Sequence, residues 1–144
     1  MNDIRPCAIT MGEPSGIGGE ISLKAWLNSP SDTRPFFVID CPARLAEISS
    51  RLNLNVEIAK ISAPAEALQT FAHALPVLPL DSIVEAITGH PDPKNADAVI
   101  ESIKRAFEYA KDGAAAAVVT NPLQKEVLYR ANFSHPGHTE YLAH

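Results

Sequence analysis

The side chains best suited to chemistry gather near the carboxyl end of the sequence, in the segment SHPGHTE at residues 134–140. Two histidines lie three residues apart, and a threonine hydroxyl and a glutamate carboxylate follow them directly. Metal-binding histidine pairs on a helix prefer a spacing of four, as in H-E-x-x-H, whereas Pro136 and Gly137 turn the backbone between His135 and His138. The spacing therefore argues against a metal ion shared by these two histidines.

The residues after Gly137 are typical of the start of a helix, with Thr139 near the N-cap. Free backbone amides and the helix dipole favour a negatively charged group at such a position. The imidazole of His138 and the hydroxyl of Thr139 would suit a polyhydroxy acid, which makes them candidate ligand-binding residues. The alternative is an ordinary helix start that binds nothing.

A glycine-rich loop is the second candidate site, since four of the seven glycines fall within residues 12–19 (GEPSGIGG). Glycine permits positive φ and close approach of a ligand, and amides at the start of the next helix favour an anion. The loop lacks the Lys-Ser or Lys-Thr of a P-loop. Its order G-x-x-x-G-x-G matches short-chain dehydrogenases, although the sequence has no Tyr-x-x-x-Lys pair. A tight turn without ligand is the alternative.

Asp40 follows an apolar run, where a dinucleotide-binding fold places the acid that contacts ribose. We favour instead a role for Asp40 as a turn residue or helix N-cap. The third candidate site is the segment TNPLQK at residues 120–125. Asn121 and Lys125 would face a cleft there and hold an anionic or hydroxylated ligand. In the alternative interpretation, Thr120 and Asn121 only cap the next helix.

The elements that must position these residues follow from the hydrophobic pattern. Short apolar runs bounded by turn residues predict strands at 7–11, 36–39, 56–59 and 115–120, the last of the fully buried kind. Periodic spacing predicts helices at 17–27, 43–52 and 95–111, and another that Pro122 opens and that extends to about residue 131. Residues 75–80 (LPVLPL) contain two prolines, which favour an edge strand or an extended segment.

Alternation of strands and helices, with strands that are apolar throughout, predicts an α/β fold. We expect a mostly parallel sheet with helices on both faces. Ligands of such folds bind at the carboxyl ends of the strands. Gly12–Gly19, Asp40–Pro42 and Thr120–Lys125 would all lie at that edge, and the histidine cluster follows the last of them by one helix.

Composition narrows the class of protein. The 144 residues suffice for one domain, and 46% hydrophobic and 20% charged residues are typical of a globular protein. The net charge of −5 argues against a nucleic acid partner. No apolar run is long enough to span a membrane, and the first residues do not resemble a signal peptide, so we expect a cytoplasmic location. Cys7 and Cys41 suit small apolar packing positions rather than a disulfide or a metal site.

Three stretches together resemble one enzyme family. They are TMGEPSGIGGEI near the start, VVTNPLQKEVL after the last predicted strand, and HPGHTEYLA at the end. Their order and spacing, from Ile9 to Ala143, resemble the 4-hydroxythreonine-4-phosphate dehydrogenase family. The sequence departs from the usual family pattern at four positions within these loops, which are Glu13, Ser15, Gly19 and Asn121.

The resemblance implies a particular reaction. Members of this family oxidise 4-phosphohydroxy-L-threonine with NAD or NADP, and the keto acid that forms loses carbon dioxide on the route to pyridoxal phosphate (vitamin B6). His138 and Thr139 match the substrate-binding pair of the family. Glu13, Gly16, Asn121 and Lys125 are expected to line the cleft.

The resemblance also implies what surrounds the site. Family members are homodimers with two α/β domains of the isocitrate/isopropylmalate dehydrogenase kind. Residues 1–144 would be the amino-terminal part of such a subunit, and the remainder would be absent. The divalent metal, zinc, magnesium or cobalt, is held in the family by three histidines that come later than this sequence reaches. We therefore expect no metal ligand within this chain and no activity from this segment alone.

Three alternatives remain open at the level of sequence. Close relatives act on other phosphorylated four-carbon hydroxy acids, such as threonate or erythronate phosphate. The glycine order and Asp40 also fit a fragment of a short-chain-type dehydrogenase. A non-catalytic α/β module that binds an anionic metabolite would share the same fold.

Overall fold

The computed structural model describes residues 4–130. Its strands are β1 (Cys7–Thr10), β2 (Phe36–Asp40), β3 (Ile58–Lys60), β4 (Leu75–Pro79) and β5 (Val118–Val119). Its α-helices are α1 (Gly18–Leu27), α2 (Pro42–Arg51), α3 (Ala67–Thr70), α4 (Ala96–Lys111) and α5 (Lys125–Arg130), and two short 3₁₀ helices are η1 (Pro64–Glu66) and η2 (Pro93–Asn95). None of the helices in this part of the chain is long and apolar enough to cross a membrane.

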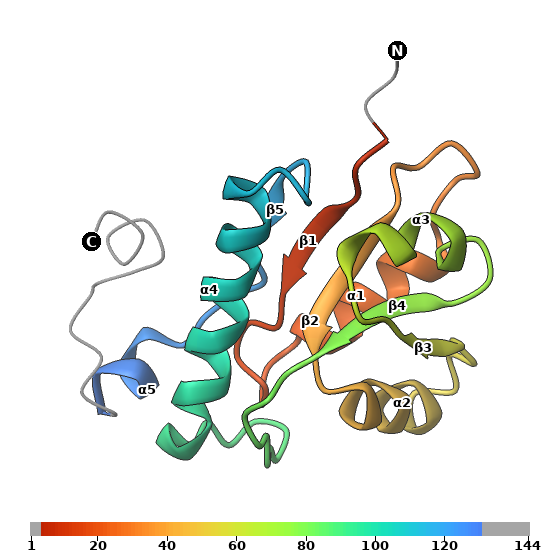
Figure 1. The fold of residues 1–144 in the computed structure, drawn as a ribbon. Helices are drawn as coiled ribbons and strands as arrows, with labels where there is room; N and C mark the ends of the chain where they lie inside the picture. The colour runs from red at the N-terminus through yellow and green to blue at the C-terminus, as the bar shows by residue number, and fades with distance from the viewer. Residues whose placement is uncertain (1–3, 131–144) are drawn as a thin grey trace.

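The five described strands form one parallel sheet in the order β3-β4-β2-β1-β5. Each connection between parallel strands returns through a helix or an extended crossover, which is the pattern that strand–helix alternation predicts. All carboxyl ends of the strands therefore lie at one edge of the sheet, as the arrows of β1, β2 and β4 show in Figure 1. The predicted α/β class and the parallel sheet are confirmed.

Helices cover both faces of the sheet (Figure 1). On one face, Leu23 of α1 and Leu45 of α2 pack against Val38 and Val77 of the central strands. On the other face, Ala106 of α4 packs in a second apolar cluster with Phe37. All five residues of β2 are buried, since this strand lies at the centre of the sheet between the two helical layers.

One strand prediction is wrong. The segment LPVLPL is not at an edge, because β4 pairs with β3 on one side and with β2 on the other. Its prolines are tolerated because Pro76 and Pro79 occupy the second and the last position of β4. The flanking donors still complete the ladders, since the Leu75 N–H donates to the Glu57 carbonyl at 2.8 Å and the Leu80 N–H donates to the Asp40 carbonyl at 3.1 Å.

Two predictions at the carboxyl end also need correction. The strand expected at 115–120 to be fully buried consists of Val118–Val119 alone, and it is an edge strand of the described sheet with Val119 50% exposed. The helix expected to start at Pro122 starts at Lys125, and its predicted end near residue 131 lies outside the described residues. Residues 121–124 form an extended loop instead, because Asn121 and Pro122 are engaged by the glycine loop described below.

Candidate functional site

The loops that follow β1, β2 and β5 meet at the carboxyl edge of the sheet. β1 lies between β2 and β5, so its glycine loop has the other two loops as direct neighbours. The Met11 N–H at the end of β1 donates to the Ser102 hydroxyl at 2.9 Å, and that hydroxyl donates to the Ile39 carbonyl at 2.8 Å. This buried serine of α4 therefore fixes the exits of β1 and β2 relative to each other, a role that the sequence alone did not indicate.

Gly12 allows the glycine loop to pack directly on the loop after β5. Its φ is +72°, and a Cβ atom at this position would lie 2.7 Å from the Pro122 carbonyl oxygen and 2.8 Å from Cβ of Asn121. The adjacent Glu13 N–H donates to the same Pro122 oxygen at 2.8 Å. Gly18 is similarly confined, since an added Cβ would lie 2.7 Å from the Met11 carbonyl oxygen. Both glycines are thus required for close packing between loops.

Asn121 joins the two loops through its buried amide. Its Nδ2 donates to the Thr10 carbonyl at 2.9 Å and to the Ser22 hydroxyl at 3.0 Å, and its backbone N–H donates to the Thr10 hydroxyl at 3.1 Å. A longer contact of 3.4 Å reaches the Gly18 carbonyl. Asn121 does not cap α5, which begins four residues later at Lys125. Its side chain positions the glycine loop, β1 and α1 relative to the loop after β5.

Glu13 turns back onto its own loop. The residue is 8% exposed, and its Oε1 accepts hydrogen bonds from the Ser15 hydroxyl at 2.7 Å and from the Ser15 N–H at 3.1 Å. The Glu13 carbonyl accepts a further bond from the Gly16 N–H at 3.0 Å. The Glu13 carboxylate thus occupies the Ser15 N–H, a donor that a bound phosphate group would otherwise use. This argues against phosphate binding by the loop.

The candidate residues differ in how far they reach solvent. Gly16 is exposed beside the buried Glu13 and Ser15, and Lys125 is exposed at the first residue of α5. The structure therefore brings Glu13, Gly16 and Asn121 into one contiguous site, with Lys125 at the end of the loop that Asn121 opens. His135, His138 and Thr139 lie outside the described residues.

Asp40 is engaged in an internal ion pair. Arg44 contacts both carboxylate oxygens, with Nε to Oδ1 at 3.0 Å and Nη2 to Oδ2 at 2.7 Å, and the Cys41 N–H donates to Oδ1 at 2.6 Å. Asp40 is 1% exposed. It is neither the turn residue nor the helix N-cap that the sequence favours, since it is the last residue of β2 and Cys41 is the N-cap of α2. Because a guanidinium pairs with it, the described residues offer no free carboxylate at this position to a ribose.

The segment after β4 also contributes to the site, and sequence reasoning had not placed it there. The Gly89 N–H donates to the Ser15 carbonyl at 2.8 Å, so the turn at Gly89 lies against the glycine loop. Among residues 4–130, no three His, Cys, Asp or Glu side chains lie close enough together to hold a metal ion. Cys7 and Cys41 are both free thiols and half-buried.

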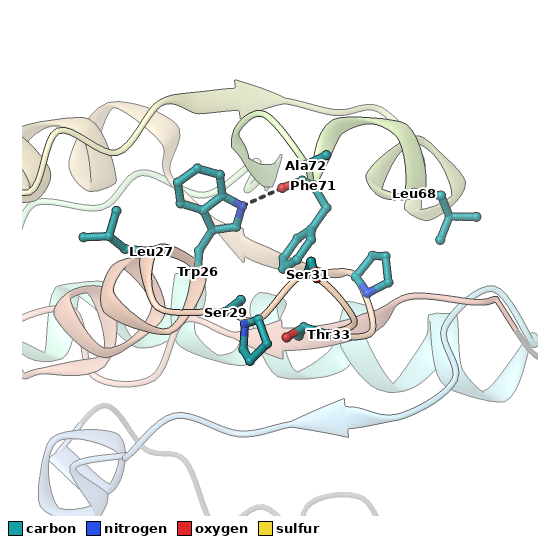
Figure 2. Close-up of a pocket in the computed structure, with 10 residues that line it drawn as sticks. Trp26, Leu27, Ser29, Ser31, Thr33, Leu68, Phe71 and Ala72 are labelled. Atoms are coloured by element: carbon teal, nitrogen blue, oxygen red, sulfur yellow. Dashed lines mark hydrogen bonds between the residues drawn. The ribbon is translucent and has the colours of Figure 1, made fainter.

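A large groove in the described part of the chain lies elsewhere, at the amino ends of the strands (Figure 2). It has a volume of about 560 Å³ and lies between the end of α1 and α3. Trp26 and Phe71 form its aromatic wall, and the Trp26 Nε1–H donates to the Phe71 carbonyl at 2.8 Å. Pro35 directly precedes β2, so this groove opens at the edge opposite the candidate loops. It is therefore not part of the candidate site.

Comparisons with known proteins agree on one family. Residues 32–144 match the family model described as pyridoxal phosphate biosynthetic protein PdxA. The chain is 50% identical to the 4-hydroxythreonine-4-phosphate dehydrogenase of Methylorubrum populi, over 99% of this chain and 41% of that protein. It is 40% identical to the protein of the same name from Bradyrhizobium diazoefficiens, over 96% of this chain and 43% of that protein.

Solved structures give the same result. A 4-hydroxythreonine-4-phosphate dehydrogenase from Burkholderia phymatum superposes with a TM-score of 0.89 at 30% identity, over 99% of this chain and 44% of that one. The enzyme of that name from Klebsiella pneumoniae superposes with a TM-score of 0.80 at 35% identity, over 97% and 44%. The chain thus spans less than half the length of the relatives that it matches.

Proposed function

The chain belongs to the family of pyridoxal phosphate biosynthetic proteins PdxA, and from this premise we infer that it contributes to a dehydrogenase acting on 4-phosphohydroxy-L-threonine. The 50% identity to a protein named for this activity, maintained over 99% of the chain, is the observation that carries the proposal. In it, the substrate is oxidised with NAD or NADP and then decarboxylated on the route to pyridoxal phosphate. The family assignment also removes the reason to consider a short-chain-type dehydrogenase.

We further propose that residues 1–144 form the amino-terminal part of a two-domain subunit, which acts in the cytoplasm as a homodimer. The relatives are more than twice as long as this chain, which supports the first part of this proposal. Asp40 is paired with Arg44, and no three His, Cys, Asp or Glu side chains among residues 4–130 lie close enough together to hold a metal ion. The divalent cation, zinc, magnesium or cobalt, would be held by residues outside this part of the chain.

Within the proposal, the described loops form one wall of the substrate cleft. Gly16 and Lys125 are exposed there, and Lys125 would provide a positive charge for the phosphate group. Asn121 would act indirectly, by fixing the two loops at the separation that the substrate requires. His138 and Thr139 are proposed to contact the substrate because they match the substrate-binding pair of the family that the sequence resembles.

The proposal predicts a clear division of activity. The longer protein that carries this segment should reduce NAD or NADP with 4-phosphohydroxythreonine and a divalent metal, and residues 1–144 alone should not. In the longer protein, His138→Ala should raise KM at least about tenfold, because it removes a hydrogen bond to a charged group. Activity only with threonate or erythronate phosphate would instead assign the chain to a related four-carbon substrate. Turnover by residues 1–144 alone would refute the proposed division.

A further inference from the structure

The carboxylate of Glu13 is buried but only half satisfied by the described residues. The residue is 8% exposed, and both hydrogen bonds that it receives, from the N–H and the hydroxyl of Ser15, go to Oε1. No residue in the described part of the chain donates a hydrogen bond to Oε2. A buried acceptor without a donor costs about 1–3 kcal/mol, and more when it is charged. Oε2 is therefore available to a donor from outside this set.

The charge of Glu13 is also uncompensated. Arg44 contacts the loop by donating to the Pro14 carbonyl at 3.0 Å, but its other hydrogen bonds go to both oxygens of Asp40. Within residues 4–130, Glu13 forms no ion pair with any Lys, Arg or His. Arg44 thus pairs with Asp40, and no hydrogen bond or ion pair joins it to the Glu13 carboxylate. Burying such a charge is costly unless a cation or strong donors meet it.

The position of Glu13 is fixed by its backbone. Its N–H donates to the Pro122 carbonyl at 2.8 Å, and its own carbonyl accepts from the Gly16 N–H at 3.0 Å. The hydrogen bonds from the Ser15 N–H and hydroxyl to Oε1 hold the carboxylate against this backbone. A charged group held in this way, at the carboxyl end of a central strand and beside the exposed Gly16, is preorganised for a ligand.

We propose that Glu13 receives the α-ammonium group of an amino-acid substrate and so determines specificity. This inference rests on the proposed function, because 4-phosphohydroxythreonine carries an amino group at the carbon next to its carboxylate. Threonate and erythronate phosphates carry a hydroxyl group at that carbon. An ammonium group would both donate to Oε2 and neutralise the buried charge, whereas a hydroxyl group would only donate.

The test compares two ligands and two forms of the longer protein that carries this segment. Calorimetry would measure the Kd of 4-phosphohydroxythreonine and of 4-phosphoerythronate for the unchanged protein and for Glu13→Gln. The glutamine retains an oxygen for Ser15 but loses the charge. We expect the variant to bind the amino ligand about 10- to 100-fold more weakly and the hydroxy ligand less than about threefold more weakly.

Two controls separate recognition from packing. Ser15→Ala removes a donor to Oε1 without changing charge, so it should affect both ligands alike. Glu20→Gln removes an exposed acid of α1 that is paired with Lys24, so it should affect neither. If Glu13→Gln does not fold, as judged by thermal melting, the affinities of the unchanged protein for the two ligands still test the inference. It should prefer the amino ligand at least about tenfold, and equal affinities would overturn the inference.

The experiment distinguishes failure of the proposed function from failure of the proposed role of Glu13. If the unchanged protein binds neither ligand, the proposed function fails and the role of Glu13 fails with it. If it binds both but Glu13→Gln weakens both equally, the proposed function survives and the role of Glu13 is refuted. That second outcome would mean that a protein cation or a structural contact satisfies Oε2.

Discussion

Gly12 and Gly89 share a backbone conformation but not an environment. Their φ values are +72° and +80°. A Cβ atom added at Gly12 would lie 2.7 Å from the Pro122 carbonyl oxygen, whereas none of the described atoms lies within 4 Å of one added at Gly89. Both alanine variants incur the cost of positive φ, about 1–2 kcal/mol. Only Gly12→Ala also forces a backbone overlap, which adds about 1–3 kcal/mol.

We therefore expect Gly12→Ala to lower the free energy of unfolding of the chain more than Gly89→Ala does. Urea denaturation of the two variants and the unchanged chain measures the difference. The pair is well matched, because the substitution and the backbone strain are the same. Equal losses of unfolding free energy in the two variants would show that the loop after β5 can move away from Gly12. Close packing would then not explain why position 12 is a glycine.

The amide of Asn121 makes a prediction of its own. Asn121→Ala leaves the buried Thr10 carbonyl and Ser22 hydroxyl without their donor, so it should cost about 1–3 kcal/mol in urea denaturation. Gln124→Ala on the same loop is the control, since Gln124 is exposed and contributes only its backbone carbonyl, to the Leu128 N–H. If Asn121→Ala loses no more unfolding free energy than the control, the side chain of Asn121 does not link the two loops.

At the residue scale, the contacts that give these side chains their roles could not be predicted from the sequence. The sequence marked Asn121 as a candidate because of its place after a predicted strand, but its partner Thr10 lies 111 residues away. Ser102, which fixes the exits of β1 and β2, carried no local signal within its helix. Glu13 was found as part of the glycine loop, yet its turn back toward Ser15 depends on side-chain geometry that spacing does not reveal.

At the scale of elements, α4 holds the segment after β4 through one carboxylate. Glu101 accepts hydrogen bonds from the Asp81 N–H and the Ser82 N–H, each at 2.8 Å, and from Arg105 at 3.1 Å. Arg105 also donates to the Pro79 carbonyl at 2.8 Å. Burial alone would raise the pKa of Glu101, but these hydrogen bonds together outweigh burial and hold the pKa below its usual value of 4.5.

This shift fixes the sign of a pH effect. A carboxyl group whose pKa is lowered on folding stabilises the fold above its usual pKa, and the stabilisation is lost as pH falls through the folded value. We expect hydrogen-exchange protection of the Asp81 and Ser82 amides, corrected for intrinsic rates, to fall about fivefold between about pH 6 and about pH 3. Glu101→Gln should show the lower protection already at the higher pH.

Glu47→Gln is the control for this measurement, because Glu47 forms only an exposed pair with Arg51 and should change nothing at residues 81–82. Protection that stays constant with pH in the unchanged chain would contradict the role of Glu101. The result would then assign the anchoring of this segment to Asn95, whose side chain donates to the Glu85 carbonyl at 2.8 Å.

The elements that the sequence predicted well are those with one dominant signal. Residues 96–111 show a clear helical period and end before Gly113, whose φ is +83°, and the buried β2 is a continuous apolar run. β4 was misjudged because proline suggests an edge, while its central residues keep their donors. The start of α5 was misjudged because contacts with the glycine loop, remote in sequence, override the preference of Pro122 for a first turn.

At the scale of the whole molecule, the parallel sheet explains why the candidate residues meet at all. Residues 12–16 and 121–125 are about as far apart in sequence as the described chain permits, yet β1 and β5 are neighbours and deliver both loops to one edge. The aromatic groove lies at the opposite edge, where the strands begin. Because ligands of parallel α/β folds bind at the carboxyl ends of the strands, the direction of the strands favours the loops after β1 and β5 as the candidate site.

The two edges of the described sheet differ in how they are protected. At β3, Glu57 and Lys60 are exposed charges, which discourage pairing with another chain. β5 consists of two valines, it pairs only with β1 among the described strands, and Val119 is 50% exposed. An apolar edge of this kind favours pairing with a second copy of the chain, although the net charge of −5 opposes association.

We therefore expect residues 1–144 to self-associate with increasing protein concentration, and added salt to strengthen this association by screening the charge. Val119→Lys should shift sedimentation velocity profiles toward the monomer, since it places a charge on the edge strand. Ile83→Lys is the matched control, because Ile83 is 80% exposed but lies in a loop outside the sheet, so it should leave the profiles unchanged. If both variants shift the profiles equally, general hydrophobicity rather than the β5 edge drives association. A monomer at every concentration would show that this edge is covered or too short to pair.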